Sequence, residues 1–286
     1  MRKLCARGLR HPCGHVRPPA EAEISAPEFP PRMEWLGVPF RQMDRLLGQH
    51  AVLVEFWDFA RVHSLRTLPY LRAWHERYAE AGLAVIGVHS PGYSFGRDRG
   101  PVERAVERLE VPYPVVLDPD LQIWRLYGNR GWPGRYLFDR TGLLRFYHYG
   151  EGEYLDTELA IQECLGEIDD EVSYAQPLEP LRPEDAPGVL LRPQTADVAL
   201  PGDRHRLQLV CDWVDGEDWI EASDAGAAAT FEFSAGGAYA VLSGGGVEPG
   251  LYETEGTVTA AAPGLRLHGV QFTPEPPGPS GSPSEA

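Results

Sequence analysis

The chain has 286 residues, 43% of them hydrophobic, which is enough for a buried core and for more than one domain. Residues 1–166 carry 21 basic and 21 acidic side chains, whereas residues 167–286 carry 5 basic and 21 acidic ones. The formal net charge of -16 therefore lies in the C-terminal part. An acidic surface repels phosphate backbones, so we expect no nucleic-acid partner.

Residues 1–25 are basic and are predicted to form a flexible leader. The apolar stretch of a signal peptide does not follow, and no run of about 18 apolar residues occurs elsewhere, so we expect no membrane contact and a cytoplasmic location. Cys5, His11, Cys13 and His15 cluster in this leader, but their spacing differs from that of zinc sites. We expect neither a metal nor another cofactor.

From residue 26 onward, strand and helix patterns alternate. Apolar runs predict buried strands at Ala51–Phe56 and Leu83–His89, and helical spacing predicts a helix over Ser64–Gly82. Shorter patterns predict a helix, a strand, a helix, two strands and a helix at residues 101–109, 113–118, 121–127, 135–139, 143–150 and 154–168. This alternation predicts an α/β domain over residues 26–168, with a mixed central sheet flanked by helices.

The amino-acid composition changes after residue 168. Residues 169–200 are rich in proline and acid and are predicted to be a linker. Segments 206–214, 229–235, 238–246, 257–263 and 265–274 are short, β-rich and separated by glycine turns. They predict a small all-β sandwich, of the jelly-roll kind, over residues 201–274. Residues 275–286 are predicted to be a disordered tail.

The segment VLVEFWDFARVHSLRTLPYL, at residues 52–71, resembles the strand, active-site turn and first long helix of the TlpA-like, DipZ-type redoxin branch of the thioredoxin fold. The segments NRGWPGRYLFDRTG and YGEGEY resemble the same branch. The resemblance implies that Pro133 forms a cis peptide bond facing the turn and that Pro69 lies where the helix bends. It also implies that Glu55 is the buried acid that assists thiol chemistry in relatives.

Where the family carries C-x-x-C, this chain has RVHS at residues 61–64. Disulfide exchange needs a thiolate at a helix N-terminus and a second thiol that resolves the mixed disulfide. Arg61 and Ser64 supply neither, and peroxide reduction would need a cysteine at the same turn. Cys164 and Cys211 are expected elsewhere, in the last helix and in the second domain. We predict no catalytic residue and favour a protein that is not an enzyme.

Other uses of the turn remain open. Ser64 beside His63 suggests hydrolysis, but neighbouring residues at a helix start point in different directions and no nucleophile elbow is present. N-capping of the helix is the expected use of Ser64. Glu55 is expected to pair with Arg61 or His63, or to be a relic without a role.

The groove beside the turn is expected to persist and to bind a peptide or protein partner. Its predicted lining is Trp57, Arg61, His63, Trp132 and Pro133. Arg61 at a helix N-terminus favours an anionic ligand. Core packing is the alternative role of the two tryptophans, and it is favoured more for Trp57 than for Trp132.

The segments VEPGLYE and APGLRLHGVQFTP resemble the carbohydrate-binding-module-like domain that follows the thioredoxin domain in DipZ-type proteins. Candidates for sugar stacking and hydrogen bonding are Trp213, Trp219, Tyr239, Tyr252, Asp212, Asp215 and Asp218. A sandwich of this size buries aromatic residues in any case, which favours packing. Three functions thus remain: non-catalytic peptide or protein binding, thiol–disulfide oxidoreductase or antioxidant activity implied by the resemblance, and carbohydrate-associated binding.

Overall fold

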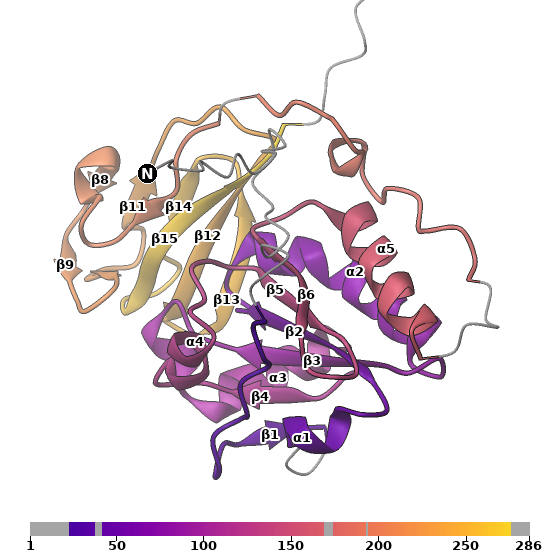
Figure 1. Cartoon of the computed structure of the whole chain (residues 1–286). Helices are drawn as coiled ribbons and strands as arrows, with labels where there is room; N and C mark the ends of the chain where they lie inside the picture. The colour runs from indigo at the N-terminus through magenta and orange to yellow at the C-terminus, as the bar shows by residue number, and fades with distance from the viewer. Residues whose placement is uncertain (1–22, 38–41, 169–173, 193, 276–286) are drawn as a thin grey trace, which may run out of the picture.

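The computed structural model describes residues 23–37, 42–168, 174–192 and 194–275 (Figure 1). The first domain is built around a six-stranded sheet of order β1-β4-β3-β2-β5-β6. Its central strand β2 pairs in parallel with β3 and antiparallel with β5, so the sheet is mixed. The strands are β1 Trp35–Leu36, β2 Ala51–Trp57, β3 Leu83–His89, β4 Val115–Leu117, β5 Gly134–Phe138 and β6 Leu144–Tyr149.

Helices cover both faces of this sheet because β2 and β3 are apolar on both sides. Leu53 and Val85 pack on one face, in a core shared with α2, α3 and α5, while Val54 and Ile86 pack on the other face near α4. The helices are α1 Met43–Leu46, α2 Val62–Tyr78, α3 Arg99–Arg108, α4 Gln122–Leu126 and α5 Tyr154–Gly166, with a 3-10 turn, η1, at Ser94–Arg97. The predicted α/β fold is confirmed.

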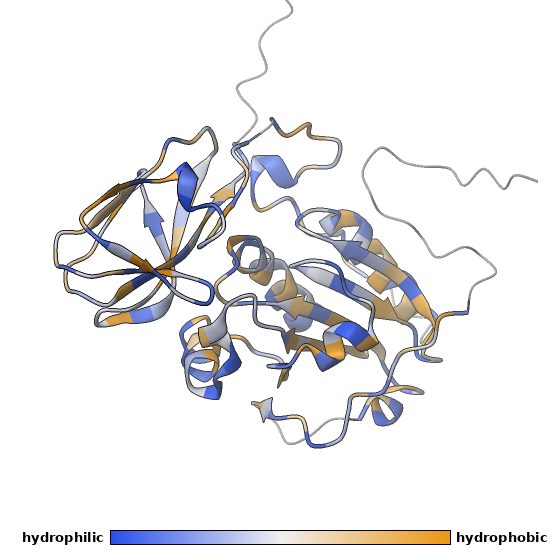
Figure 2. Cartoon of the chain, turned by 90° about the vertical axis from the view of Figure 1, so that its left-hand side faces the viewer, coloured by the Kyte–Doolittle hydropathy of each residue, from blue (hydrophilic) through white to orange (hydrophobic). Residues whose placement is uncertain are grey.

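The second domain is all β, as predicted, and lies beside the first (Figure 1, Figure 2). One sheet has the order β13-β12-β15-β10-β9, with β7 also paired to β15, and a smaller sheet has the order β14-β11-β8. The strands are β7 Val198–Ala199, β8 Gln208–Val210, β9 Trp213–Asp215, β10 Ile220–Ala222, β11 Ala228–Thr230, β12 Gly237–Gly244, β13 Val247–Thr254, β14 Thr257–Thr259 and β15 Leu265–Thr273. Two 3-10 turns, η2 Pro183–Asp185 and η3 Arg204–Arg206, precede β8.

The predicted strand at 206–214 is wrong. Cys211 has a φ of 63°, which an extended strand does not accommodate, and the chain divides there into β8 and β9 in different sheets. The sequence pattern also missed β10 and β13. The proline within β13, Pro249, and the glycine that follows it mask the strand pattern.

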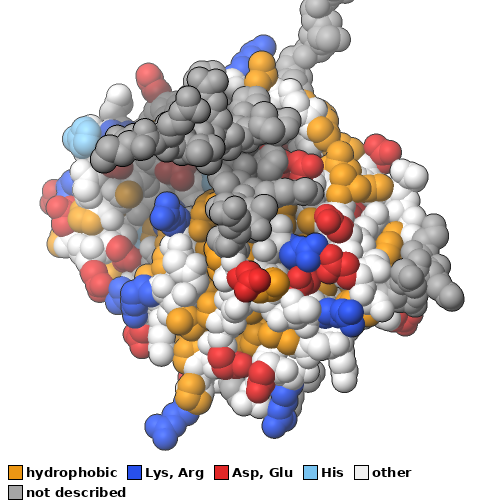
Figure 3. Space-filling model, in the orientation of Figure 1, with side chains coloured by type: hydrophobic (Ala, Val, Ile, Leu, Met, Phe, Trp, Pro, Cys, Tyr) orange, Lys and Arg blue, Asp and Glu red, His pale blue; other side chains and the backbone are white. Residues whose placement is uncertain are grey.

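Part of the predicted linker packs on the first domain. Tyr174 and Leu178 lie against its core, the backbone N–H of Leu181 donates to Tyr70 Oη at 2.8 Å, and Arg182 forms an ion pair with Asp185 at 2.9 Å. Figure 1 shows this segment running past α2 and α5 before it reaches the second domain. On the face shown in Figure 3, acidic and basic side chains are interspersed over the first domain, in agreement with its balanced charge.

In the described part of the chain, no helix is long and apolar enough to cross a membrane.

Glu158 of α5 holds the linker segment to the helices. Its carboxylate is buried and accepts hydrogen bonds from Trp74 Nε1 at 3.1 Å and Tyr78 Oη at 2.6 Å. It also accepts from Arg77 at 2.7 Å and from the backbone N–H of Leu178 at 2.9 Å. One carboxylate thus satisfies donors from α2 and from the linker.

Replacing this carboxylate tests the arrangement. Glu158→Ala leaves several buried donors without an acceptor, so we expect the free energy of unfolding to fall by about 3 to 5 kcal/mol in denaturant titrations. We also expect faster proteolysis of residues 174–186. Asp156→Ala, which removes an exposed carboxylate from the same helix, is the control and should have little effect. Equal stability of the two variants would show that Glu158 does not hold the segment.

Candidate functional site

The turn between β2 and α2 is fixed by Asp58. This buried carboxylate accepts the backbone N–H of Ala60 at 2.8 Å and that of Gly92, in the loop after β3, at 2.7 Å. His89 Nε2 lies 3.6 Å from the same side chain. Burial raises the pKa of Asp58, but the neighbouring His89 and the charge of Arg61 bring it below its ordinary value. Asp58 therefore remains an anion that anchors the turn.

Arg61, the residue before α2, is held by aromatic rings. Its guanidinium carbon lies 4.7 Å from the ring centroid of Tyr93 and 4.8 Å from that of Trp132. Gly92 provides the space, since a Cβ there would lie 2.7 Å from the guanidinium. Trp132 is fixed in turn by a hydrogen bond of 2.8 Å from Nε1 to the Ser90 carbonyl. The Arg61 guanidinium, which was predicted to bind an anion, thus packs against two aromatic rings. Asp58 lies nearby as its counter-charge.

His63 and Ser64 point to different partners. His63 Nδ1 lies 2.5 Å from Glu151, which also binds Arg66, and these bonds and charges hold the pKa of Glu151 below its usual value against the effect of burial. Ser64 is buried, and its hydroxyl accepts the backbone N–H of Asp58 at 3.3 Å. The pair has no shared geometry for hydrolysis.

The prediction that Ser64 caps α2 is wrong. The helix begins at Val62, so Ser64 is its third residue and Arg61 is the N-cap, with no capping bond from the Arg61 side chain. The cap comes from the second domain instead. The backbone N–H of Val62 donates to Gln271 Oε1 of β15 at 2.8 Å.

Gln271 is the site residue that sequence reasoning missed. Its amide Nε2 donates to the carbonyl of Ala60 at 2.7 Å and to Tyr93 Oη at 3.1 Å. The Gln271 side chain is 1% exposed and Val62 is 4% exposed, so these bonds are closed to water. More than 200 residues separate the partners, and no local pattern marks Gln271 as a cap.

The expectation that Glu55 pairs with Arg61 or His63 is wrong. Glu55 projects from β2 into the core, where its Oε2 lies 3.3 Å from Arg135 Nε. Arg135 donates to Thr157 Oγ1 at 2.8 Å and lies over the rings of Trp74 and Tyr154. Burial raises the pKa of Glu55 to about 7, although the neighbouring Arg135 lowers it. The two side chains form a buried pair inside the domain.

The five predicted groove residues do not line one cleft. Arg61 and Trp132 meet, but Trp57 is buried with its ring edge against His89, and Pro133 is buried after a cis peptide bond. His63 faces Glu151 instead.

The two described cysteines lie apart from the turn. The side chain of Cys164, on α5, packs into the core of the first domain, where burial raises its pKa to about 12. Cys211 is exposed between β8 and β9. Within the described ranges no group of three or more His, Cys, Asp or Glu is placed to hold a metal. The cluster of Cys5, His11, Cys13 and His15 lies outside the described residues.

The aromatic residues of the second domain do not form a shared platform. Trp213 is buried in the β core, and Trp219 lies against Arg266 and His268. Tyr252 alone of the four candidates lines a pocket of about 510 Å³ on β12, β13 and β14. Of the candidate acceptors, Asp215 pairs with Arg204 and Asp218 binds Ser94 and His268, while the backbone carbonyl of Asp212 accepts from Ser223.

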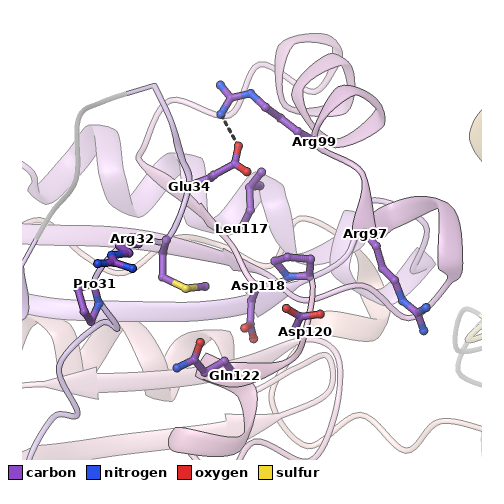
Figure 4. A pocket seen from close by; sticks show the side chains of 11 residues that line it. Pro31, Arg32, Glu34, Arg97, Arg99, Leu117, Asp118, Asp120 and Gln122 are labelled. Atoms are coloured by element: carbon purple, nitrogen blue, oxygen red, sulfur yellow. Dashed lines mark hydrogen bonds and ion pairs between the residues drawn. The ribbon is translucent and has the colours of Figure 1, made fainter.

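A second pocket, of about 310 Å³, lies between residues 31–34 and the loop after β4 (Figure 4). Several of its polar groups are engaged within the protein. Asp118 accepts the backbone N–H groups of Ile123 and Trp124 at the start of α4, and Arg99 pairs with Glu34 at 3.0 Å. These residues shape the chain rather than converge on a ligand.

The buried pair of Glu55 and Arg135 predicts a pH dependence. The pKa of Glu55 is about 7 in the folded protein, against an ordinary value of 4.5. The folded state therefore binds the proton more tightly than the unfolded state. Because of this, the free energy of unfolding falls as pH rises from about 4.5 through 7. We expect Glu55→Gln, which keeps the side-chain shape but cannot ionise, to abolish a fall of up to about 3 kcal/mol between pH 5 and pH 8. Denaturant unfolding at several pH values measures it.

The control for this measurement is Glu107→Gln, an exposed substitution on α3 that should retain the wild-type slope. An identical slope in both variants would mean that Glu55 titrates normally.

Comparison with known proteins supports the assignment of the first domain. Residues 37–147 match the AhpC/TSA family. The chain is 34% identical over 174 residues to Protein DipZ of Mycobacterium tuberculosis, a match covering 60% of this chain and 25% of DipZ. It is 24% identical over 143 residues to the thiol-disulfide oxidoreductase YkuV of Bacillus subtilis, covering 50% of this chain and 95% of YkuV. The chain thus spans a quarter of the length of DipZ.

Among solved structures, a thioredoxin-like protein in the oxidized form aligns with a TM-score of 0.47 and 23% identity, over 51% of this chain and 98% of that one.

Proposed function

Because residues 37–147 match the AhpC/TSA family, we propose that this chain is a redoxin-type protein of thioredoxin-like fold whose active-site turn binds protein instead of exchanging disulfides. One observation carries the proposal: the guanidinium of Arg61, at the position of the family's first cysteine, fills the space between Tyr93 and Trp132. Ser64, at the second position, is buried in α2. An arginine has no nucleophilic sulfur, and a serine closes no disulfide.

The surrounding contacts support a binding role. Asp58 anchors the backbone of the turn, and two backbone groups there, Val62 N–H and Ala60 C=O, pair with the Gln271 side chain of the second domain. Backbone groups that pair with an incoming chain are a common basis of protein recognition.

Thiol–disulfide exchange is the competing function, since YkuV is named for it and the family is shared. For this chain it would need a thiol from a partner or from residues outside the turn.

Carbohydrate binding by the second domain stays a prediction, which Tyr252 supports alone among the four aromatic candidates. The cytoplasmic location also stays a prediction.

An insulin-reduction assay with dithiothreitol separates binding from redox activity. We expect the wild-type chain to match the dithiothreitol background, because residues 58–64 contain no cysteine and neither described cysteine lies near them. Turnover comparable to that of a thioredoxin would refute the proposal.

The double variant Arg61→Cys, Ser64→Cys tests whether the scaffold is intact. We expect its two thiols to form a reversible disulfide, because the substitutions restore the family spacing at the start of α2. Thiol titration against a redox buffer measures it, with Arg61→Cys alone as the control. A double variant that forms no disulfide would show that the turn has lost the redoxin geometry.

A further inference from the structure

The side chain of Gln271 makes three of the four hydrogen bonds open to a primary carboxamide. Its oxygen accepts from Val62, and the two protons of its nitrogen go to Ala60 and Tyr93, at 2.8, 2.7 and 3.1 Å. A carboxylate of the same shape would place an acceptor against the carbonyl of Ala60. The turn therefore discriminates between an amide and an acid.

The polarity of α2 favours the same orientation. The first N–H groups of a helix lack partners within it and carry a partial positive charge. Val62 supplies the first of these groups, and the carbonyl oxygen of Gln271 lies against it. The amide nitrogen then faces Ala60, one peptide outside the N-cap.

The β domain holds Gln271 in this position. Gln271 is paired with Tyr239 of β12, within the longest strand of that domain. Val241 of β12 is buried in the core of the first domain, and Leu251 of β13 packs against it. Burial of these two apolar side chains thus stabilises the contact between the second domain and the first.

A second, partly buried polar contact joins the same two domains. Asp218 accepts the backbone N–H of Ser94 at 2.6 Å and its hydroxyl at 2.9 Å. His268 lies 3.2 Å from Asp218 through Nδ1 and 2.7 Å from Ser243 through Nε2. With Ser243 and His268 both buried, this serine–histidine–aspartate relay braces the interface and is closed to substrate.

We propose that residues 60–62 and Tyr93 form a carboxamide-binding site whose ligand is Gln271 of the same chain. The C-terminal domain thereby closes, from within, the groove that redoxins leave open to partners. This inference rests on the proposed function, because a reactive thiol at residue 61 would need the face that the β domain covers. A partner reaching the turn must displace the domain and offer a glutamine or asparagine side chain.

The test is amide hydrogen exchange at Val62 in the full chain. We expect a Val62 protection factor at least tenfold lower in Gln271→Met, which keeps the side-chain length without the amide, than in the wild type. Tyr93→Phe, which removes one acceptor, should lower it only a few-fold. Protection in the central strand β2 controls for global unfolding, and Gln208→Glu, exposed in the same domain, should match the wild type.

The variant Gln271→Glu separates hydrogen bonding by Gln271 from simple packing, because only hydrogen bonding makes Val62 protection depend on pH. A protonated carboxyl offers one acceptor and one donor, whereas its anion offers only acceptors. The anion sets an oxygen against the Ala60 carbonyl, and this repulsion displaces the side chain. Val62 protection in this variant should therefore be near wild type at low pH and be lost as pH rises, while the wild-type protection factor stays level. Full protection in Gln271→Met, or a pH-independent Gln271→Glu, would overturn the inference. Redox turnover by the wild type would contradict the proposed function alone and leave this result intact.

Discussion

The N-terminus of the first long helix sets the main constraint on this molecule. The N–H of Val62 is buried, and a buried donor without a partner destabilises the fold by about 1 to 3 kcal/mol. In thiol-bearing relatives a thiolate benefits from such a helix N-terminus. Here a neutral amide oxygen from Gln271 takes that place, so the helix depends on a domain more than 200 residues away in sequence.

The other polar groups of the site are paired with groups of the same chain. Arg61 lies between two aromatic rings, with Asp58 as its counter-charge, and Glu55 pairs with Arg135 inside the core. His63 is held by Glu151, which also binds Arg66. Each group thus has a structural use in its present position.

The sequence predicts the first domain well because its elements are strongly periodic. Leu83–His89 is found at its predicted bounds, and α2 begins two residues before the predicted helix and ends four residues earlier. The helix start decides the role of Ser64, since a shift of two residues moves it from the cap into the first turn. The break at Cys211 escapes pattern reasoning because a single left-handed residue leaves the apolar run unchanged.

Sequence patterns do not identify pairs of residues that come into contact only in the tertiary fold. Glu55 and Arg135 come from adjacent strands whose pairing has to be known before their contact follows. Gln271 lies in a strand whose apolar neighbours reveal its sheet but not the other domain it touches.

The most direct test of the account is the scalar coupling across the hydrogen bond between the Val62 amide nitrogen and the side-chain carbonyl carbon of Gln271. We predict a measurable coupling in the isotope-labelled full chain, together with slow exchange of the Val62 proton. A Val62 amide that exchanges rapidly with water and shows no coupling to Gln271 would contradict the claim that the second domain caps the redoxin turn.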